Sequence, residues 1–410
     1  LITVGILADL EEGIGGGVNQ ATQGLVEGLL SQTNSGIRYV LFLADKSDIQ
    51  NVLESEYVSV VRVRHKEFPR GWRKWQDRIV RNGWALSQAA VGNLMDARVT
   101  RNWRPRQQTI LEAIRRSPWR LDIVHFPFQD FVQLKVPFIF SPWDLQHIHL
   151  KEFWTEDMAK SRDAYYRKGC RLAESVVLGS KWASEDLIAQ YGIPRSKTTV
   201  VPIASPTRLS APVTEDFCTE VRAKYSLPPR FIFYPAATWK PKNHLRLISA
   251  LARADEGATR DLWLVCSGQN GRNFKEIMTH ARDAGIHERV SFLGHIPSQE
   301  VRALYRMAEF CIYPSLFEGA GLPVLEAFEE GCPLTASDVT CIPEYTGDAA
   351  LLFDPWDVDS IADAISKMAS DESLRRDLSV HGKRRVHGYS WERVADEFNS
   401  LYRRLANDIK

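Results

Sequence analysis

The stretch Phe310–Gly331, FCIYPSLFEGAGLPVLEAFEEG, has the pattern of a strand, a tight loop and a helix. Its first four residues are apolar, β-branched or aromatic, as in a buried strand, and the glycine-rich segment after Pro314 predicts a loop. Pro323 suits the first turn of a helix, which Gly331 would end. Such a loop directs backbone N–H groups and the positive end of a helix at one place, where an anion such as phosphate binds.

Glu318 and Glu326 flank this predicted anion site. A carboxylate repels a nearby phosphate, so its presence there is explained only if it binds neighbouring hydroxyl groups. A sugar and a ribose diol would supply such hydroxyls. The alternative is structural, because a glutamate in the first turn of a helix stabilises that helix by roughly 0.3–1 kcal/mol without any ligand. For Glu326 alone, both interpretations stay open.

The string Ser315–Pro333, SLFEGAGLPVLEAFEEGCP, closely resembles the E-x7-E motif of retaining glycosyltransferases of family four, in a bacterial polysaccharide or mannosyltransferase-like subgroup. The resemblance is strongest over residues 230–355. It implies a GT-B fold, in which two domains face each other across a cleft, and a nucleotide-sugar donor bound by this loop. Glu318 would hold the donor sugar and Glu326 the ribose, while the loop backbone binds the diphosphate through Gly319, Ala320, Gly321 and Leu322.

A second motif, Ala236–His244 (AATWKPKNH), follows a predicted strand and also resembles the family. Lys242 matches the family lysine that neutralises the donor diphosphate, and an ammonium is a suitable partner for a departing phosphate. Alanine stands where the family usually has an arginine, and Lys240 is the candidate to replace it. Asn243 completes the donor-binding set of this segment.

Two further segments have positions that the family uses for ligands. His295 and Ile296 follow a predicted strand beside which the family docks its nucleotide base. Asp144 and His147 follow another predicted strand, at the end where open α/β sheets bind ligands. Because Trp143 replaces the histidine of the family's His-Asp pair, we assign Asp144 to the catalytic set with Glu318 and Lys242, and His147 to the acceptor side.

Gly15, Gly16 and Gly17 form a glycine cluster after the first predicted strand. Glycine lets the backbone approach a ligand closely, so we place the cluster on the acceptor side. A flexible turn is the alternative.

Short apolar runs alternate with helical patterns along the chain, which predicts an α/β protein with two doubly wound parallel sheets, each in a Rossmann-like domain. We expect an acceptor-side domain over residues 1–205, a donor domain over 206–385, and a helix over 386–410 that crosses back to the first domain, as in GT-B proteins. The predicted strands are Thr3–Leu7, Tyr39–Leu43, Val58–Val63, Ile123–Phe126, Phe138–Phe140, Ser175–Gly179, Thr199–Pro202, Phe231–Tyr234, Leu262–Cys266, Val290–Leu293 and Phe310–Tyr313.

Composition restricts the class of protein. The 52 Lys and Arg nearly balance the 51 Asp and Glu, which gives no sign of a nucleic acid partner, and we expect none. The six cysteines form no C-x-x-C pair, so we expect a reduced, cytoplasmic protein without structural zinc. No apolar run reaches the roughly 18 residues of a membrane span, and the apolar N-terminus has the pattern of a buried strand rather than of a signal peptide.

The segment Arg62–Arg106 interleaves arginine and lysine with aromatic residues, among them four tryptophans. This pattern fits a peripheral contact with anionic lipid at the inner face of the membrane. It fits equally a solvated helix face above buried tryptophans. Both interpretations stay open.

Together, the motifs predict a retaining hexosyltransferase that moves a sugar from a nucleoside-diphosphate sugar, with GDP-mannose as one candidate, to a hydroxyl of a glycan, lipid-linked or small-molecule acceptor. Lys242 and the helix after Gly321 can stabilise the leaving diphosphate in place of a divalent metal, and no D-x-D motif ends a predicted strand. We therefore expect neither a metal nor another cofactor. The alternatives are a sugar phosphorylase on the same fold, against which Glu326 argues, and a non-catalytic scaffold that binds sugar nucleotides.

Overall fold

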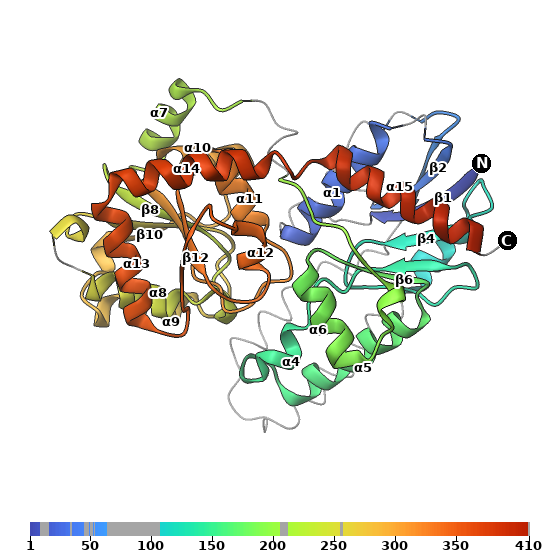
Figure 1. Cartoon of the computed structure of the whole chain (residues 1–410), viewed down its shortest axis with the longest axis horizontal. Coiled ribbons are helices and arrows are strands. Elements are labelled where there is room, and N and C mark those ends of the chain that lie inside the picture. Colours follow the sequence, from blue (N-terminus) through green and yellow to red (C-terminus); the bar gives the residue numbers. More distant parts are fainter. Residues whose placement is uncertain are drawn as a thin grey trace, which may run out of the picture. The chain divides into compact units, whose positions relative to one another are not determined.

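The computed structural model describes residues 1–8, 16–32, 35–44, 49, 52, 54–63, 107–205, 212–254 and 257–408. These residues form two parallel β-sheets flanked by helices (Figure 1). Gly15 and nearly all of the segment Arg62–Arg106 lie outside the described residues.

The first sheet has seven strands in the order β3-β2-β1-β4-β5-β6-β7. They are β1 (Ile2–Ala8), β2 (Ile37–Ala44), β3 (Val58–Val63), β4 (Ile123–Phe126), β5 (Phe138–Phe140), β6 (Ser175–Leu178) and β7 (Thr198–Val200). The helices between them are α1 (Gly17–Leu30), α4 (Gln146–His149), α5 (Glu156–Leu172) and α6 (Lys181–Tyr191). The central strands β1 and β4 are almost completely buried, as expected for a parallel sheet covered on both faces.

The second sheet has six strands in the order β10-β9-β8-β11-β12-β13. They are β8 (Phe231–Pro235), β9 (Trp263–Ser267), β10 (Val290–Phe292), β11 (Phe310–Tyr313), β12 (Leu334–Ser337) and β13 (Leu351–Phe353). Its helices are α7 (Glu215–Lys224), α8 (His244–Arg253), α9 (Phe274–Asp283), α10 (Ser298–Met307), α11 (Leu322–Glu329), α12 (Ile342–Thr346), α13 (Val358–Ser370) and α14 (Glu372–Val386). Figure 1 shows α10 and α14 along one face of this sheet and α8, α9 and α13 along the other.

The strand order of the second sheet is that of a Rossmann fold, in which the chain starts in the middle, builds one edge and then returns to build the other. The first sheet follows the same order with one strand added. Two Rossmann-like parallel sheets are therefore confirmed. Most predicted strands match within one or two residues, and β12 and β13 were not predicted.

The chain divides into two compact units. The first unit contains Leu1–Pro142, Trp154–Val176 and Phe398–Lys410, and the second contains Trp143–Phe153 and Val177–Glu397. The last helix, α15 (Trp391–Asp408), thus contributes its first turns to the second unit and the rest to the first.

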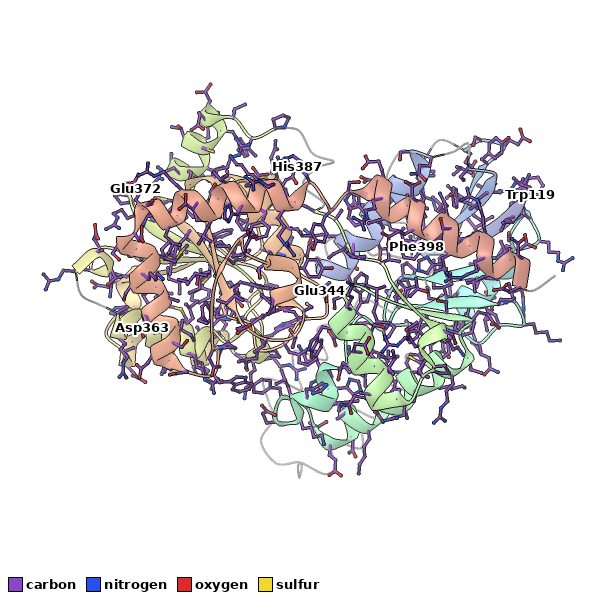
Figure 2. The ribbon with its side chains drawn as sticks, viewed as in Figure 1. Trp119, Glu344, Asp363, Glu372, His387 and Phe398 are labelled. Atoms are coloured by element: carbon purple, nitrogen blue, oxygen red, sulfur yellow. The ribbon has the colours of Figure 1, made fainter. Side chains whose placement is uncertain are left out.

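Residues of α15 from Phe398 onward complete the core of the first unit. The ring of Phe398, labelled in Figure 2, lies 4.8 Å from the ring of His125 on β4. The Tyr39 hydroxyl donates a hydrogen bond of 2.6 Å to Asn399, and the Tyr402 hydroxyl lies 2.8 Å from Nδ1 of His125. Burial lowers the pKa of His125 to about 3, so this imidazole is neutral.

None of the helices within the described ranges is both long and apolar enough to cross a membrane.

Candidate active site

The candidate site lies where the strand order of the second sheet reverses. Strands β8 and β11 are neighbours in the sheet, and the chain leaves them toward opposite edges. In open parallel sheets, the loops that follow two such strands leave a crevice at their carboxyl ends in which ligands bind. The loop after β8 contains Lys242, and the loop after β11 contains Glu318. The fold therefore brings the two sequence motifs to one crevice.

Lys242 and Glu318 are in direct contact. The Lys242 ammonium donates a hydrogen bond to Oε1 of Glu318, and the two side chains are 21% and 13% exposed, so both keep access to solvent. The hydroxyl of Ser315 donates to the same carboxylate oxygen at 2.5 Å. Ser315 is fully buried, so its hydroxyl is a fixed donor. The buried hydroxyl of Tyr313, at the end of β11, is a further hydrogen-bond partner of this carboxylate, and burial together with the Glu318 charge raises the Tyr313 pKa.

The backbone around Lys242 is fixed by buried polar groups. Lys242 ends a short 3₁₀ helix, Lys240–Lys242, and its carbonyl accepts a 2.7 Å hydrogen bond from the buried hydroxyl of Tyr234. The next residue, Asn243, is buried and donates from its side chain to the carbonyls of Pro314 at 3.1 Å and Pro355 at 2.7 Å. Asn243 thus holds the Lys242 turn against the start of the Glu318 loop. The structure gives it a positioning role.

The loop between Glu318 and α11 is packed so closely that it requires glycine at two positions. A Cβ atom on Gly319 would lie 2.3 Å from the carbonyl oxygen of Trp143, and one on Gly321 would lie 2.5 Å from the ring of Tyr345. Ala320 follows Gly319 and is half-buried, and Leu322 is buried as the first residue of α11. Pro323 occupies the first turn of that helix, as predicted.

The N-terminus of α11 has the features of an anion site. No side chain in the described residues caps it. Its first N–H groups and the positive end of the helix dipole lie directly after the loop that carries Glu318, the partner of the Lys242 ammonium. Backbone donors and a lysine ammonium are together suited to a diphosphate.

Glu326 lies in the second turn of α11 and is only 7% exposed. The hydroxyl of Tyr305, on α10, donates to its Oε2 at 3.2 Å. Burial raises the pKa of Glu326 to about 7, the Tyr305 hydrogen bond opposes this shift, and the negative charge of Glu330 adds to it. The structural alternative for Glu326 required a carboxylate in the first turn of the helix, and no acidic residue lies in the first turn of α11.

The other residues assigned to the donor lie farther along the same sheet edge. His295 is exposed and Ile296 is buried in the loop after β10. Lys240 is exposed at the start of the 3₁₀ helix that ends at Lys242. No contact in the described residues joins these three side chains to the Lys242–Glu318 pair.

Asp144 and the residues assigned to the acceptor differ in burial and in hydrogen-bond partners. Asp144 is half-buried and its Oδ1 accepts a 3.1 Å hydrogen bond from the backbone N–H of Gln146, at the start of α4. His147 is buried, with its Nε2 3.4 Å from the Tyr191 hydroxyl. Gly16 and Gly17 are exposed at the start of α1, in the first unit.

The described residues contain no group of three or more His, Cys, Asp or Glu side chains placed to hold a metal ion. The aspartates of the string Asp357–Asp359, which has D-x-D spacing, have structural partners. Asp357 caps α13 by accepting from the backbone N–H of Asp359, whose carboxylate pairs with Arg253.

Two residues of the site were not predicted. Ser315 belongs to the E-x7-E string, and a hydroxyl three residues before a loop glutamate is a signal from which its contact could be predicted. Tyr305 lies in the string LYR, where an aromatic residue on the apolar face of a helix predicts only core packing. Its contact with Glu326 depends on how α10 and α11 pack.

Comparison with known proteins covers the segment that contains Lys242, Glu318 and Glu326. Residues 219–385 match the family model described as "Glycosyl transferases group 1". The O-antigen chain mannosyltransferase B of Escherichia coli is 26% identical over 264 residues, which are 64% of this chain and 69% of that protein. The serotype-specific mannosyltransferase WbdA of Escherichia coli is 26% identical over 249 residues, but the match covers only 30% of that longer protein and 58% of this chain.

A solved structure agrees over the full length of the chain. Sucrose-phosphate synthase from Thermosynechococcus elongatus superimposes with a TM-score of 0.71 over 99% of both chains, at 19% sequence identity. At this identity the similarity concerns the fold, which is GT-B. The resemblance drawn from the E-x7-E string is confirmed by the family match.

Proposed function

We propose that the protein is a retaining, metal-independent hexosyltransferase that uses a nucleoside-diphosphate sugar, in keeping with the match of residues 219–385 to the family model of the group 1 glycosyltransferases. The observation that carries the proposal is the Lys242–Glu318 ion pair at the switch point of the second sheet. It places one cation and one hydroxyl-binding carboxylate within a single crevice. A diphosphate joined to a sugar presents the complementary pair of groups.

In this proposal, Lys242 stabilises the diphosphate as it leaves. Breaking the bond between the sugar and the diphosphate puts negative charge on a phosphate oxygen, and a fixed ammonium favours that charge. The N-terminus of α11 contributes in the same direction. These groups supply what a divalent metal would supply elsewhere, so the reaction should need no added metal.

The two motif glutamates have separate roles in this proposal. Glu318 binds hydroxyls of the donor sugar, because a carboxylate has acceptor sites beyond those that its protein partners use. Glu326 binds the ribose diol, because a carboxylate can accept from both hydroxyls. Asp144 and His147 are proposed to contact the reacting sugar and the acceptor.

The proposed donor is GDP-mannose and the proposed acceptor is a glycan, free or carried on a lipid. Support comes from the relatives, since both of the Escherichia coli proteins are named as mannosyltransferases and one of them acts on O-antigen chains by its name. A cytoplasmic location is proposed with this donor. It is in keeping with the six cysteines, which are all free thiols.

The direct test is transfer from GDP-mannose, assayed beside UDP-glucose and mannose 1-phosphate, with and without excess chelator. We expect product from GDP-mannose with the anomeric configuration of the donor, at a rate that the chelator does not change. Transfer from mannose 1-phosphate alone would identify a phosphorylase. Binding of the sugar nucleotide without any turnover would identify a scaffold.

Membrane contact through the segment Arg62–Arg106 belongs to the same proposal when the acceptor is lipid-linked. Each Lys or Arg near an anionic surface contributes about 1 kcal/mol, so binding to anionic vesicles should weaken as salt is added. Cosedimentation with anionic and neutral vesicles measures this, and a chain that ignores anionic vesicles at low salt has no such contact.

A further inference from the structure

We propose that Tyr305 is a positioning residue for Glu326. The Tyr305 hydroxyl orients the Glu326 carboxylate for its ligand and favours the ionised carboxylate at neutral pH. The inference rests on the proposed function, because it assigns the ligand of Glu326 as the ribose of a nucleoside diphosphate. It adds a residue from α10, outside both sequence motifs, to the binding site.

The Tyr305 hydroxyl is held in place from both sides. Its side chain has no exposed surface, and its ring packs edge-on against Phe233 of β8, with 5.0 Å between ring centroids. The hydroxyl lies 3.2 Å from Oε2 of Glu326 and 3.2 Å from the carbonyl oxygen of Pro323. Since the ring cannot move away without opening the core, the hydroxyl is a fixed reference point for the Glu326 side chain.

The two carboxylate oxygens of Glu326 have different surroundings. Oε2 accepts from Tyr305, whereas Oε1 has no hydrogen-bond partner in the described residues. Oε1 is also absent from the fully enclosed polar atoms that lack a partner, so it keeps contact with the space outside the core. A buried carboxylate with one oxygen anchored and the other accessible is arranged to accept a hydrogen bond from a ligand.

One tyrosine hydroxyl can satisfy both protonation states of Glu326. When the carboxylate is ionised, the hydroxyl donates to it, and this charge-assisted bond is the stronger arrangement. When Glu326 is protonated, the acid can donate to the tyrosine oxygen while the tyrosine donates to Pro323. Phenylalanine at position 305 would satisfy neither state, and the ionised one would lose more.

The neighbouring cations are paired with another carboxylate, so the hydrogen bond to Glu326 comes from Tyr305. Glu330, one turn further along α11, is bound by Arg302 at 2.5 Å and by Arg306 at 2.7 Å, so both cations of α10 are engaged there. Burial raises the pKa of the nearby thiols Cys311 and Cys332 well above neutrality, so they are uncharged. On α14, Lys383 packs against Gly331, at the opposite end of α11.

Tyr305→Phe tests the proposal, with Tyr225→Phe as the matched control. Like Tyr305→Phe, the control removes a tyrosine hydroxyl that donates to a glutamate, because Tyr225 donates to Glu300 of α10 at 2.5 Å. It leaves Glu326 of α11 untouched. Calorimetry with GDP, and with UDP as a second probe, gives the dissociation constant at each pH. The terminal phosphate of the probe titrates near pH 6, so each comparison is between variants at the same pH.

At about pH 7, Tyr305→Phe should bind GDP about tenfold more weakly than wild type, which is the usual size of one lost hydrogen bond to a charged group. Most of the affinity should return near pH 9, where Glu326 ionises without help. Tyr225→Phe should behave as wild type. A loss that is equal at every pH would mean that Tyr305 only supports the fold, and unchanged binding would mean that it does nothing for Glu326; either result overturns the proposal.

A second measurement does not depend on the ligand. The infrared carbonyl band of protonated Glu326, identified by its absence in Glu326→Gln, follows the ionisation of this one group. Its midpoint should move to higher pH in Tyr305→Phe and stay in place in Tyr225→Phe, whereas an unmoved midpoint in both contradicts the proposal. If wild type binds neither GDP nor UDP, the proposed function fails, and this titration still decides whether Tyr305 controls Glu326.

Discussion

The ammonium of Lys242 and the carboxylate of Glu318 form an ion pair although 76 positions separate them in the chain. The pair exists because β8 and β11 are adjacent in the sheet and both loops open at its carboxyl edge. Each charge is partly neutralised by the other. Under the proposed function, the donor phosphate replaces Glu318 as the partner of Lys242, and Glu318 turns to the hydroxyls of the sugar.

Lys242→Ala should lower turnover by roughly 100- to 1000-fold, the usual effect of removing one electrostatic group from a transition state. The melting temperature should change little, because a partly exposed ion pair contributes little stability. The matched control is Lys224→Ala, which also removes a lysine paired with a glutamate of the second unit, Glu300. Near wild-type turnover in a well-folded Lys242→Ala protein would rule out the proposed role.

Glu326→Gln and Glu318→Gln should have different effects on the binding of bare GDP. The first replacement weakens binding, because the ribose loses a carboxylate acceptor. The second leaves binding at the wild-type level or strengthens it, because Lys242 no longer has a competing partner, while transfer falls. Calorimetry measures both constants, and equal losses in the two variants contradict the division of roles.

The raised pKa of Glu326 predicts that its burial costs more stability as pH increases. Between about pH 4.5 and 7, the folded protein holds a proton on Glu326 that the unfolded chain has released, so stability falls across this window by up to about 1.4 kcal/mol per pH unit. Glu326→Gln cannot titrate. Its melting temperature should therefore fall less between about pH 5 and 8 than that of wild type, as calorimetric scans would show.

Gly319→Ala should lower the rate of transfer by roughly 100-fold without unfolding the chain. The new methyl group would lie 2.3 Å from the Trp143 carbonyl oxygen, which as backbone cannot turn aside, so the loop that presents Glu318 must shift. A displacement of about 1 Å is enough to cost on the order of 100-fold in rate. The control is Gly388→Ala, where the nearest atom would be 3.4 Å away. Full activity in Gly319→Ala would show that the loop position is unimportant.

The sequence predicted what local pattern determines. The strands Val58–Val63, Ile123–Phe126, Phe138–Phe140 and Phe310–Tyr313 have the predicted bounds, because each is a short apolar run between polar or turn-forming residues. β12 was missed since its string, LTAS, alternates weakly and includes small polar residues that are buried inside the protein. Burial of Thr335 and Ser337 is a property of the sheet and is not visible in the string.

The same limit applies to the site. Lys242 and Glu318 were each assigned to the donor, but their mutual contact follows from the strand order, which no motif encodes. Asn243 is predicted to bind the donor, and the contacts that its amide makes with the carbonyls of Pro314 and Pro355 could not be predicted, because both residues lie far from it in the sequence. The contact of Tyr305 with Glu326 depends on its hydroxyl, whereas the sequence pattern reveals only its apolar ring.

The division of α15 has a consequence for how the chain folds during its synthesis. The first unit needs Phe398, Asn399 and Tyr402 to cover β2 and β4, yet the ribosome makes these residues roughly 220 positions after Val176, the last earlier residue of that unit. At about 5–20 residues per second, this is a wait of roughly 10–45 s. The nascent first unit spends that time with an uncovered apolar face, whereas the second unit can close before α15 is finished. Multidomain chains usually complete their N-terminal domain first, whereas here the second unit is completed before the first. The uncovered face of the first unit is where a chaperone would bind.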